Sequence, residues 1–513
     1  MTRHGTRGVL ISMCFALVLV VASVSALNLG LPDLAVGLNA SNGELTWIAD
    51  GYTVALAALV LPIGALGDRY GRRNVLVIGT AVFALASAAA ALTDAAGALI
   101  GWRVLMGVGA AMIMPGTLST ITAVVPADKR GKAVATWSGF AAAGSILGML
   151  IAGALLERWG WESIFWVTAL AAVIAGGLAA FLAPDTREEE HHGRFDIAGA
   201  LTTCVAVGSL VYAIIEGNET GWTDTPVLIA LALFVAGLIA YVALSLRNPN
   251  PLLDPRLFTL RGFTTGSLTV VVQFMAVFGF FFVGLQYLQL ILGYSPLHSA
   301  VALIPVAAVV LPTSQITTRL VPRFGPRAVM TTGLLLLAAG MAWISRLDTA
   351  SGYLPFLAGL ILAGLGMGLT STTGTDAIVS SLSRDKQGVA SAMNDTTREV
   401  GSAIGIALMG SVYGSHYRDS LNDLPGALPT TAVDTIKESA AAGLVVAQQA
   451  GALADTITAA VEKAFMDGLS ASLIVVATVL TVAAVIVLVR APGTAIDRDE
   501  APAPPAGTRR RSP

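Results

Sequence analysis

Charged side chains are scarce in this chain. Asp, Glu, Lys and Arg make up only 12% of its 513 residues, whereas 55% are hydrophobic. Because soluble domains carry about 25% charged residues, this composition argues against a soluble protein and favours one embedded in a membrane. The formal net charge of -2 says little about such a protein, and no segment indicates a nucleic-acid-binding surface.

Residues that usually hold metals or nucleotides are also few. Cys14 and Cys204 lie inside apolar runs, and their spacing fits neither a metal site nor a disulfide framework, so we interpret them as packing residues. The histidines fall in or near loops and suggest no metal site. We find no glycine-rich phosphate-binding loop with Lys and Ser or Thr, which argues against ATP-driven pumping. No metal and no cofactor is expected.

Long apolar runs, by contrast, fill most of the chain. A helix needs about 20 apolar residues to cross a bilayer, and the lack of period-2 alternation favours helices over a barrel. Fourteen spans are predicted, near 9–31, 46–66, 75–93, 97–124, 133–155, 163–183, 196–216, 226–246, 263–290, 297–318, 327–345, 353–382, 388–412 and 469–489. The first run resembles a secretory signal, but it exceeds the ~7–15 residues of a signal core, so we expect a retained helix.

Loop charge predicts the orientation, because Lys and Arg accumulate in cytoplasmic loops. With the N-terminus inside, every predicted inner loop contains at least two Lys or Arg, whereas the outer loops 33–46 and 216–226 contain none. Both ends of the chain are therefore expected in the cytoplasm. Segment 413–468 is predicted to be external, as a helical hairpin or cap, and residues 491–513 to form a disordered cytoplasmic tail.

Two short stretches indicate an internal repeat. "GDRYGRRNVL" (67–76) aligns with "VPRFGPRAVM" (321–330), matching Arg69 with Arg323 and Gly71 with Gly325. Parallel halves around a central path are an architecture of transporters. The alternative is that short basic loops look alike by chance. We predict an N-terminal six-helix bundle (1–185), two inserted transmembrane helices (186–250) and a C-terminal six-helix bundle (251–490).

The first of these stretches also carries a family resemblance. "GALGDRYGRRNVL" (64–76) packs one acid, three arginines and three glycines between apolar runs. It resembles the loop signature of the major facilitator superfamily, and the whole chain is similar to its fourteen-span drug:proton antiporter branch, which includes quaternary-ammonium efflux pumps. The resemblance implies an all-α polytopic membrane protein of the major facilitator fold, with two six-helix bundles plus two inserted helices.

In that family the cluster is a cytoplasmic gate latch that is made and broken during transport. Asp68 can pair with an arginine or cap a neighbouring helix N-terminus. The alternative is that the arginines only anchor the topology. The second half has Pro322 where the first has Asp68, so we expect no equivalent latch there. The predicted gate residues are Gly64, Gly67, Asp68, Arg69, Gly71, Arg72 and Arg73.

Other stretches match the family with departures. "RVLMGVGAAMIMPGTLS" (103–119) resembles its fourth helix, with Arg103 at the family's buried arginine. "GSILGMLIAG" (144–153) resembles its antiporter helix motif, and Gly144, Gly148 and Gly153 fit, although the family's proline is absent. The first helix has Ser23 and Ser25 where the family places an acid and a threonine. A proton site that relied on that acid must therefore use another residue.

Charges inside the predicted spans are the candidate functional residues, since each costs about 2.5–3.5 kcal/mol or more at the bilayer centre. Asp50 lies in span 2. Asp395 and Glu399 share one face of span 13, with Arg398 beside them. A carboxylate that can bind either a proton or an organic cation would couple the two. The resemblance implies acids at the positions of Asp50, Asp395 and Glu399. A purely structural ion-pair network is the alternative.

The expected function is proton-coupled export of amphiphilic, cationic small molecules by a monomer in the cytoplasmic membrane of a bacterium. The partners are then the cargo, protons and lipid. A dedicated exporter of one metabolite or antibiotic is the alternative. A membrane enzyme or sensor is less favoured, because the chain shows no catalytic triad, metal cluster or sizeable soluble domain. Candidate cavity residues are Asn28, Trp47, Tyr52, Gln273, Gln289 and Asn394.

Overall fold

The computed structural model describes residues 5–38, 40, 42–186, 195–382, 387–421 and 428–493. Every regular element in these residues is helical, as expected of apolar runs that must satisfy their own backbone hydrogen bonds in lipid. The first six are α1 Thr6–Gly37, α2 Asn42–Tyr70, α3 Arg72–Ala90, α4 Ala96–Val124, α5 Ala127–Leu156 and α6 Glu162–Leu182. The next are α7 Ile197–Glu219, α8 Thr225–Ser245 and α9 Arg261–Gln286. The last are α10 Pro296–Ala302, α11 Ile304–Ile344, α12 Tyr353–Ser380, α13 Gln387–Ser420, α14 Thr430–Glu438, α15 Ala440–Gln449 and α16 Ala454–Arg490.

Twelve helical stretches in the described residues are long and apolar enough to cross a membrane. One of them, Leu297–Ile344, runs for 48 residues and includes both α10 and α11. The charged helix α13 is not among the twelve, although it is 34 residues long. The chain is therefore a multi-pass helical protein, built for a lipid environment.

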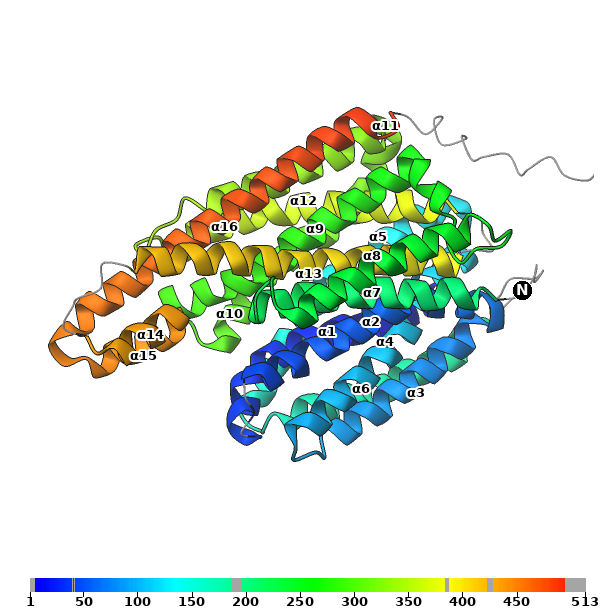
Figure 1. Cartoon of the computed structure of the whole chain (residues 1–513). Helices are drawn as coiled ribbons and strands as arrows, with labels where there is room; N and C mark the ends of the chain where they lie inside the picture. Colours follow the sequence, from blue (N-terminus) through cyan, green and yellow to red (C-terminus); the bar gives the residue numbers. More distant parts are fainter. Residues whose placement is uncertain are drawn as a thin grey trace, which may run out of the picture.

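The helices pack around two hydrophobic cores. The larger cluster of buried side chains draws mainly on α1 to α6, and the second mainly on α9 to α16. Figure 1 shows the helices running roughly side by side, with both described chain ends at the same end of the bundle, which we call the terminal face. The opposite end is called the far face. α14, α15 and the start of α16 project beyond the bundle there (Figure 1).

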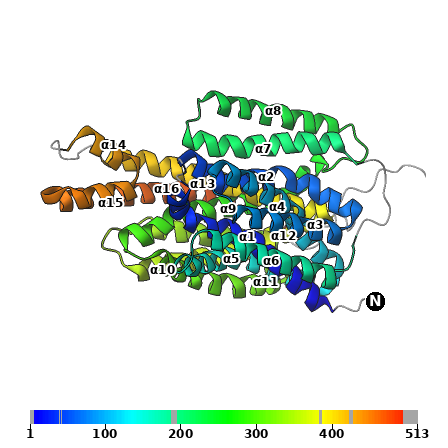
Figure 2. The same cartoon turned by 90° about the horizontal axis from the view of Figure 1, so that it is seen from below.

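α7 and α8 form a pair on the side of the bundle, outside the main group of helices (Figure 2). The Asp196 carboxylate caps α7 by accepting a hydrogen bond from the Gly199 N–H at 2.9 Å. The same carboxylate accepts one from the Leu252 N–H at 3.1 Å. The Tyr241 hydroxyl donates to the Leu253 carbonyl at 2.6 Å. The two ends of the helix pair are thus joined at its base.

The aligned stretches of the two halves have matching backbone conformations. Gly71 has φ 104° and Gly325 has φ 79°, a region that favours glycine because a Cβ would clash. The Arg69 guanidinium lies 5.9 Å from the Tyr70 ring centre, and that of Arg323 lies 5.6 Å from the Phe324 ring centre. Non-helical backbone angles at Gly325 therefore divide α11 into two helical parts, between the spans predicted at 297–318 and 327–345.

Candidate functional site

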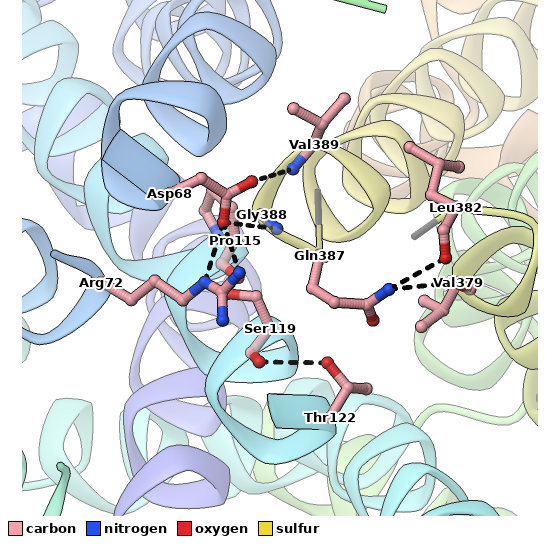
Figure 3. Close-up of polar contacts among 10 residues, drawn as sticks. All are labelled: Asp68, Arg72, Pro115, Ser119, Thr122, Val379, Leu382, Gln387, Gly388 and Val389. Carbon is pink, nitrogen blue, oxygen red and sulfur yellow. Dashed lines mark hydrogen bonds and ion pairs between the residues drawn. The ribbon is translucent and has the colours of Figure 1, made fainter. Parts of the chain in front are cut away.

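Asp68, at the end of α2, joins the first helices of the chain to α13 at the terminal face (Figure 3). Its carboxylate accepts hydrogen bonds from the backbone N–H groups of Gly388 at 2.8 Å and Val389 at 3.1 Å. These residues form the first turn of α13, 320 positions along the chain. Unpaired N–H groups and the helix dipole make such a terminus a good anion site. Asp68 therefore caps a distant helix.

Arg72 holds the same carboxylate from the other side. Its Nε donates to Asp68 Oδ1 at 2.8 Å, and its Nη2 lies 2.7 Å from that oxygen. Asp68 is 4% exposed and Arg72 3% exposed, so this contact is shielded from water. Gly64, one turn earlier, lies against α13, where a Cβ would be 2.7 Å from the Gly388 carbonyl oxygen. The cluster therefore brings two helices into close contact through a carboxylate and a glycine.

The remaining gate residues support the turn. Gly71 supplies the positive φ, and the Arg72 N–H donates to the Thr186 carbonyl at 3.0 Å. Arg69 and Arg73 are only partly buried. In the second half, Pro322 leaves no acid at the matching place, and Arg327 Nε instead donates to the Ala491 carbonyl at 2.6 Å.

The predicted antiporter glycines bring α5 against α1 and α10. A Cβ on Gly148 would lie 2.7 Å from the Ala22 Cα and would also clash with the Ala22 carbonyl. A Cβ on Gly144 would lie 3.5 Å from the Val18 Cα, an ordinary contact. Gly153 approaches Leu297 on α10. Gly148 is thus the residue that sets the α1–α5 distance.

We predict that Gly148→Ala destabilises the protein by about 1–3 kcal/mol, the usual cost of overpacking, because the new methyl group meets backbone that cannot rotate away. Gly177→Ala on α6 is the matched control, since nothing lies within 4 Å of its added Cβ. That control should be neutral or up to about 1 kcal/mol more stable, by helix propensity. Thermal unfolding in detergent compares the two, and equal melting temperatures would contradict the prediction.

Arg103 lies inside the first group of helices and faces α2. Its Nε donates to the Ile48 carbonyl at 2.9 Å, its Nη2 to the Ala49 carbonyl at 3.3 Å, and its Nη1 has no partner among the described residues. The guanidinium lies 4.6 Å from the Tyr52 ring centre and interacts electrostatically with Asp50. The predicted acid of α2 therefore shares its surroundings with the buried arginine of α4.

Asp395 and Asn394 are fully buried on α13. The Asn394 amide donates to Asp395 Oδ1 at 3.4 Å, and the Thr375 hydroxyl on α12 donates to the Asn394 oxygen at 3.0 Å. Arg398 Nη1 lies 3.8 Å from Asp395 Oδ1, beyond hydrogen-bond distance. Asp395 Oδ2 has no partner among the described residues. The acid is thus buried and incompletely paired.

The two groups of charges meet at Tyr52. Its ring contacts Arg103, and its hydroxyl also interacts electrostatically with Glu399 on α13, which is partly buried. The hydroxyl donates to the Val20 carbonyl of α1 at 3.3 Å, one turn before Ser23. Polar groups from α1, α2, α4 and α13 are therefore neighbours around Tyr52.

Two aromatic residues complete the site. The Arg398 guanidinium lies 4.8 Å from the ring centre of Trp137 on α5 and 4.6 Å from that of Phe274 on α9. Neither Trp137 nor Phe274 is among the candidates named from the sequence. Gln273 is fully buried, and neither its amide nitrogen nor its oxygen has a partner among the described residues.

The remaining cavity candidates are Trp47, Gln289 and Asn28. The Trp47 ring packs against that of Tyr212 on α7 at an angle of 38°, with ring centres 5.5 Å apart, and so contacts the peripheral helix pair. Gln289 is partly buried in the π-helical segment Tyr287–Ile291, which follows α9 near the far face. The side chain of Asn28 lies outside the described part of the chain.

The described residues thus form an all-helical, multi-pass bundle with two cores, charged residues in its interior and a buried Asp68–Arg72 pair that contacts α13. A sequence profile of the Major Facilitator Superfamily matches residues 13–406, and the chain belongs to this family. It is 32% identical to the multidrug efflux pump LfrA of Mycolicibacterium smegmatis, over 95% of this chain and 97% of the relative.

Two other proteins extend the comparison. The tetracenomycin C resistance and export protein of Streptomyces glaucescens is 30% identical, over 94% of this chain and 92% of its own. The crystal structure of the human organic anion transporter MFSD10 superposes with a TM-score of 0.62 at 14% identity, covering 94% of this chain and 99% of that one. At this identity the superposition shows the shared fold alone.

Proposed function

We propose that this protein exports amphiphilic, cationic small molecules across the cytoplasmic membrane of a bacterium, driven by proton entry. The observation that carries the proposal is Asp395, a fully buried carboxylate with one oxygen unpaired and its arginine 3.8 Å away. An incompletely paired carboxylate inside a lipid-embedded bundle has a high free energy, and binding of a proton or a cation lowers that free energy. Competition between the two would couple their movements.

The charged residues form a connected set that suits this task. Asp50 interacts with Arg103, Arg103 with Tyr52, and Tyr52 with Glu399. Glu399 in turn interacts with Arg398, beside Asp395. Protonation at one carboxylate changes the electrostatic energy of its neighbours. We propose that Asp50, Asp395 and Glu399 share proton and cation binding, tuned by Arg103 and Arg398.

We further propose fourteen transmembrane helices with both ends in the cytoplasm. The bend at Gly325 divides the stretch Leu297–Ile344 and supports two spans there. Helix α13 supports another span, because a charged helix can cross a membrane inside a bundle. The terminal face is then the cytoplasmic side. The division into 1–185, 186–250 and 251–490 follows the two cores and the peripheral pair. One chain contains the complete site, which favours a monomer.

A dedicated exporter of one antibiotic is the second candidate. It is favoured by Ser23 and Ser25, which stand where the family has an acid and a threonine. The Ser23 hydroxyl donates to the Val20 carbonyl of its own helix at 2.9 Å, so it contributes no charge. The similarity to a tetracenomycin C export protein agrees with this candidate. Export of a panel of cations and neutral antibiotics by one purified sample distinguishes the two.

Ethidium transport into proteoliposomes tests the proposal. With an acidic lumen, proton exit should drive the dye inward above its external concentration, and an ionophore that collapses the pH difference should return it to equilibrium. Empty liposomes and liposomes with heat-treated protein are the controls. The same rate and final level of dye with the gradient collapsed would exclude proton coupling.

A further inference from the structure

Arg398 has surroundings that an ion-pair role does not explain. Its guanidinium lies between two rings, 4.8 Å from Trp137 and 4.6 Å from Phe274. Trp137 is fully buried and Arg398 is 3% exposed, whereas the nearest carboxylate atom is 3.8 Å away. Its Nε has no partner among the described residues. Two rings and one carboxylate therefore surround this charge.

Two aromatic faces around one positive charge are the chemistry by which proteins recognise organic cations. The rings come from α5 and α9, and Asp395 of α13 supplies a negative charge 3.8 Å from the guanidinium. The Trp137 indole N–H donates to the Thr117 hydroxyl at 3.0 Å, which fixes the plane of the ring. An organic ammonium or phosphonium ion carries the same positive charge that these groups surround.

We propose that Arg398 is a tethered substitute for the cargo. Trp137, Phe274 and Asp395 form the cation subsite, and Arg398 occupies it until an organic cation displaces it. This inference deepens the proposed function, because it assumes that cations are exported. The displaced guanidinium remains near Glu399, with which it already interacts electrostatically. Either Arg398 or the cargo then neutralises the Asp395 carboxylate at all times. This matters because a buried carboxylate without a positive partner is costly in free energy.

If the Arg398 side chain competes with the cargo, substitutions of Trp137 and Arg398 should have non-additive effects on cargo affinity. In the wild-type background, Trp137→Leu weakens binding of the cargo and also binding of the competing Arg398 side chain. These two changes have opposite effects on the apparent affinity for the cargo. In an Arg398→Met background only the cargo is weakened. Because a desolvated cation–π contact is worth about tenfold or more in affinity, the Trp137 effect should be about tenfold larger without Arg398.

The measurement is equilibrium binding of radiolabelled tetraphenylphosphonium to purified protein at one pH, without any gradient. We expect Arg398→Met to bind about tenfold more tightly than wild type, Trp137→Leu to change the wild-type Kd by less than about threefold, and the double variant to lose about tenfold relative to Arg398→Met. Trp137→Phe, which keeps a ring, should give a smaller difference between the two backgrounds than Trp137→Leu does. Phe274→Leu provides a second, independent pair if Trp137→Leu fails to fold.

Equal Trp137 and Phe274 effects in both backgrounds would overturn the substitute role while leaving cation export standing. A neutral aromatic compound of similar size serves as the ligand control, and the same non-additivity with that compound would also overturn the proposal, since it would show a change of shape alone. If no folded variant binds the cation, the cation-export proposal falls, and the substitute role falls with it.

Discussion

Replacing Asp68 with asparagine is expected to slow export by about tenfold or more, with little change in affinity for the cargo. The reason is the set of contacts at the start of α13, where one carboxylate accepts from Gly388, Val389 and Arg72. Hydrogen bonds to a charged group contribute about 1.5–3 kcal/mol each to stability. Losing even one such contribution shifts the balance between latched and unlatched forms by about tenfold or more.

Asparagine retains the size of Asp68 but not its charge, so the backbone N–H groups of α13 and the Arg72 guanidinium lose their shared anion. The check is the kcat and KM of dye transport in proteoliposomes. Asp185→Asn is the matched control, because Asp185 is an exposed acid near the same turn. Asp68→Asn and Arg72→Gln should also be non-additive. A change confined to KM would show that Asp68 is not a latch.

Asp395→Asn should abolish gradient-driven accumulation of the cargo while leaving the fold intact. The amide is nearly the same shape as the carboxylate, but it binds no proton and neutralises no cation, so coupling has no carrier at this position. The rings around Arg398 limit the cost of leaving that guanidinium without its acid. The measurement is dye accumulation with and without an imposed pH difference.

Asp348→Asn is the control for this experiment, since Asp348 is an exposed acid in the loop between α11 and α12. A second variant, Asp395→Asn with Arg398→Met, restores neutrality in case the single change unfolds the protein. Accumulation at the wild-type level in either folded variant would remove Asp395 from the coupling mechanism and direct attention to Asp50 and Glu399.

The sequence predicted the kinds of contact that Asp68 makes more closely than the helix that it contacts. One acid among glycines and arginines indicated a carboxylate able to pair with an arginine or cap a helix, and Asp68 does both. The receiving helix was not predictable, because it lies 320 residues away and its N-terminus looks like any other. The repeat was visible because a positive φ at Gly71 and Gly325 demands glycine in both halves.

The aromatic part of the site could not be predicted for a different reason. In a helix that is apolar on every side, a tryptophan such as Trp137 looks the same whether it packs against leucine or against a guanidinium. Only the meeting of α5, α9 and α13 distinguishes these cases. The same limit applies to Arg103, which donates to the backbone carbonyl groups of Ile48 and Ala49. Every residue has such a carbonyl group, so the sequence does not show which residues will accept from the arginine.

The helix pair α7–α8 begins and ends at one place, because Asp196 binds the Leu252 N–H and Tyr241 binds the Leu253 carbonyl. A chain lacking the pair would need to bridge only that short distance. We therefore expect that α7 and α8 can be removed or exchanged as one block while the surrounding helices keep their paths. Its buried contacts with Ala57 and Ala403 are what such an exchange would have to reproduce.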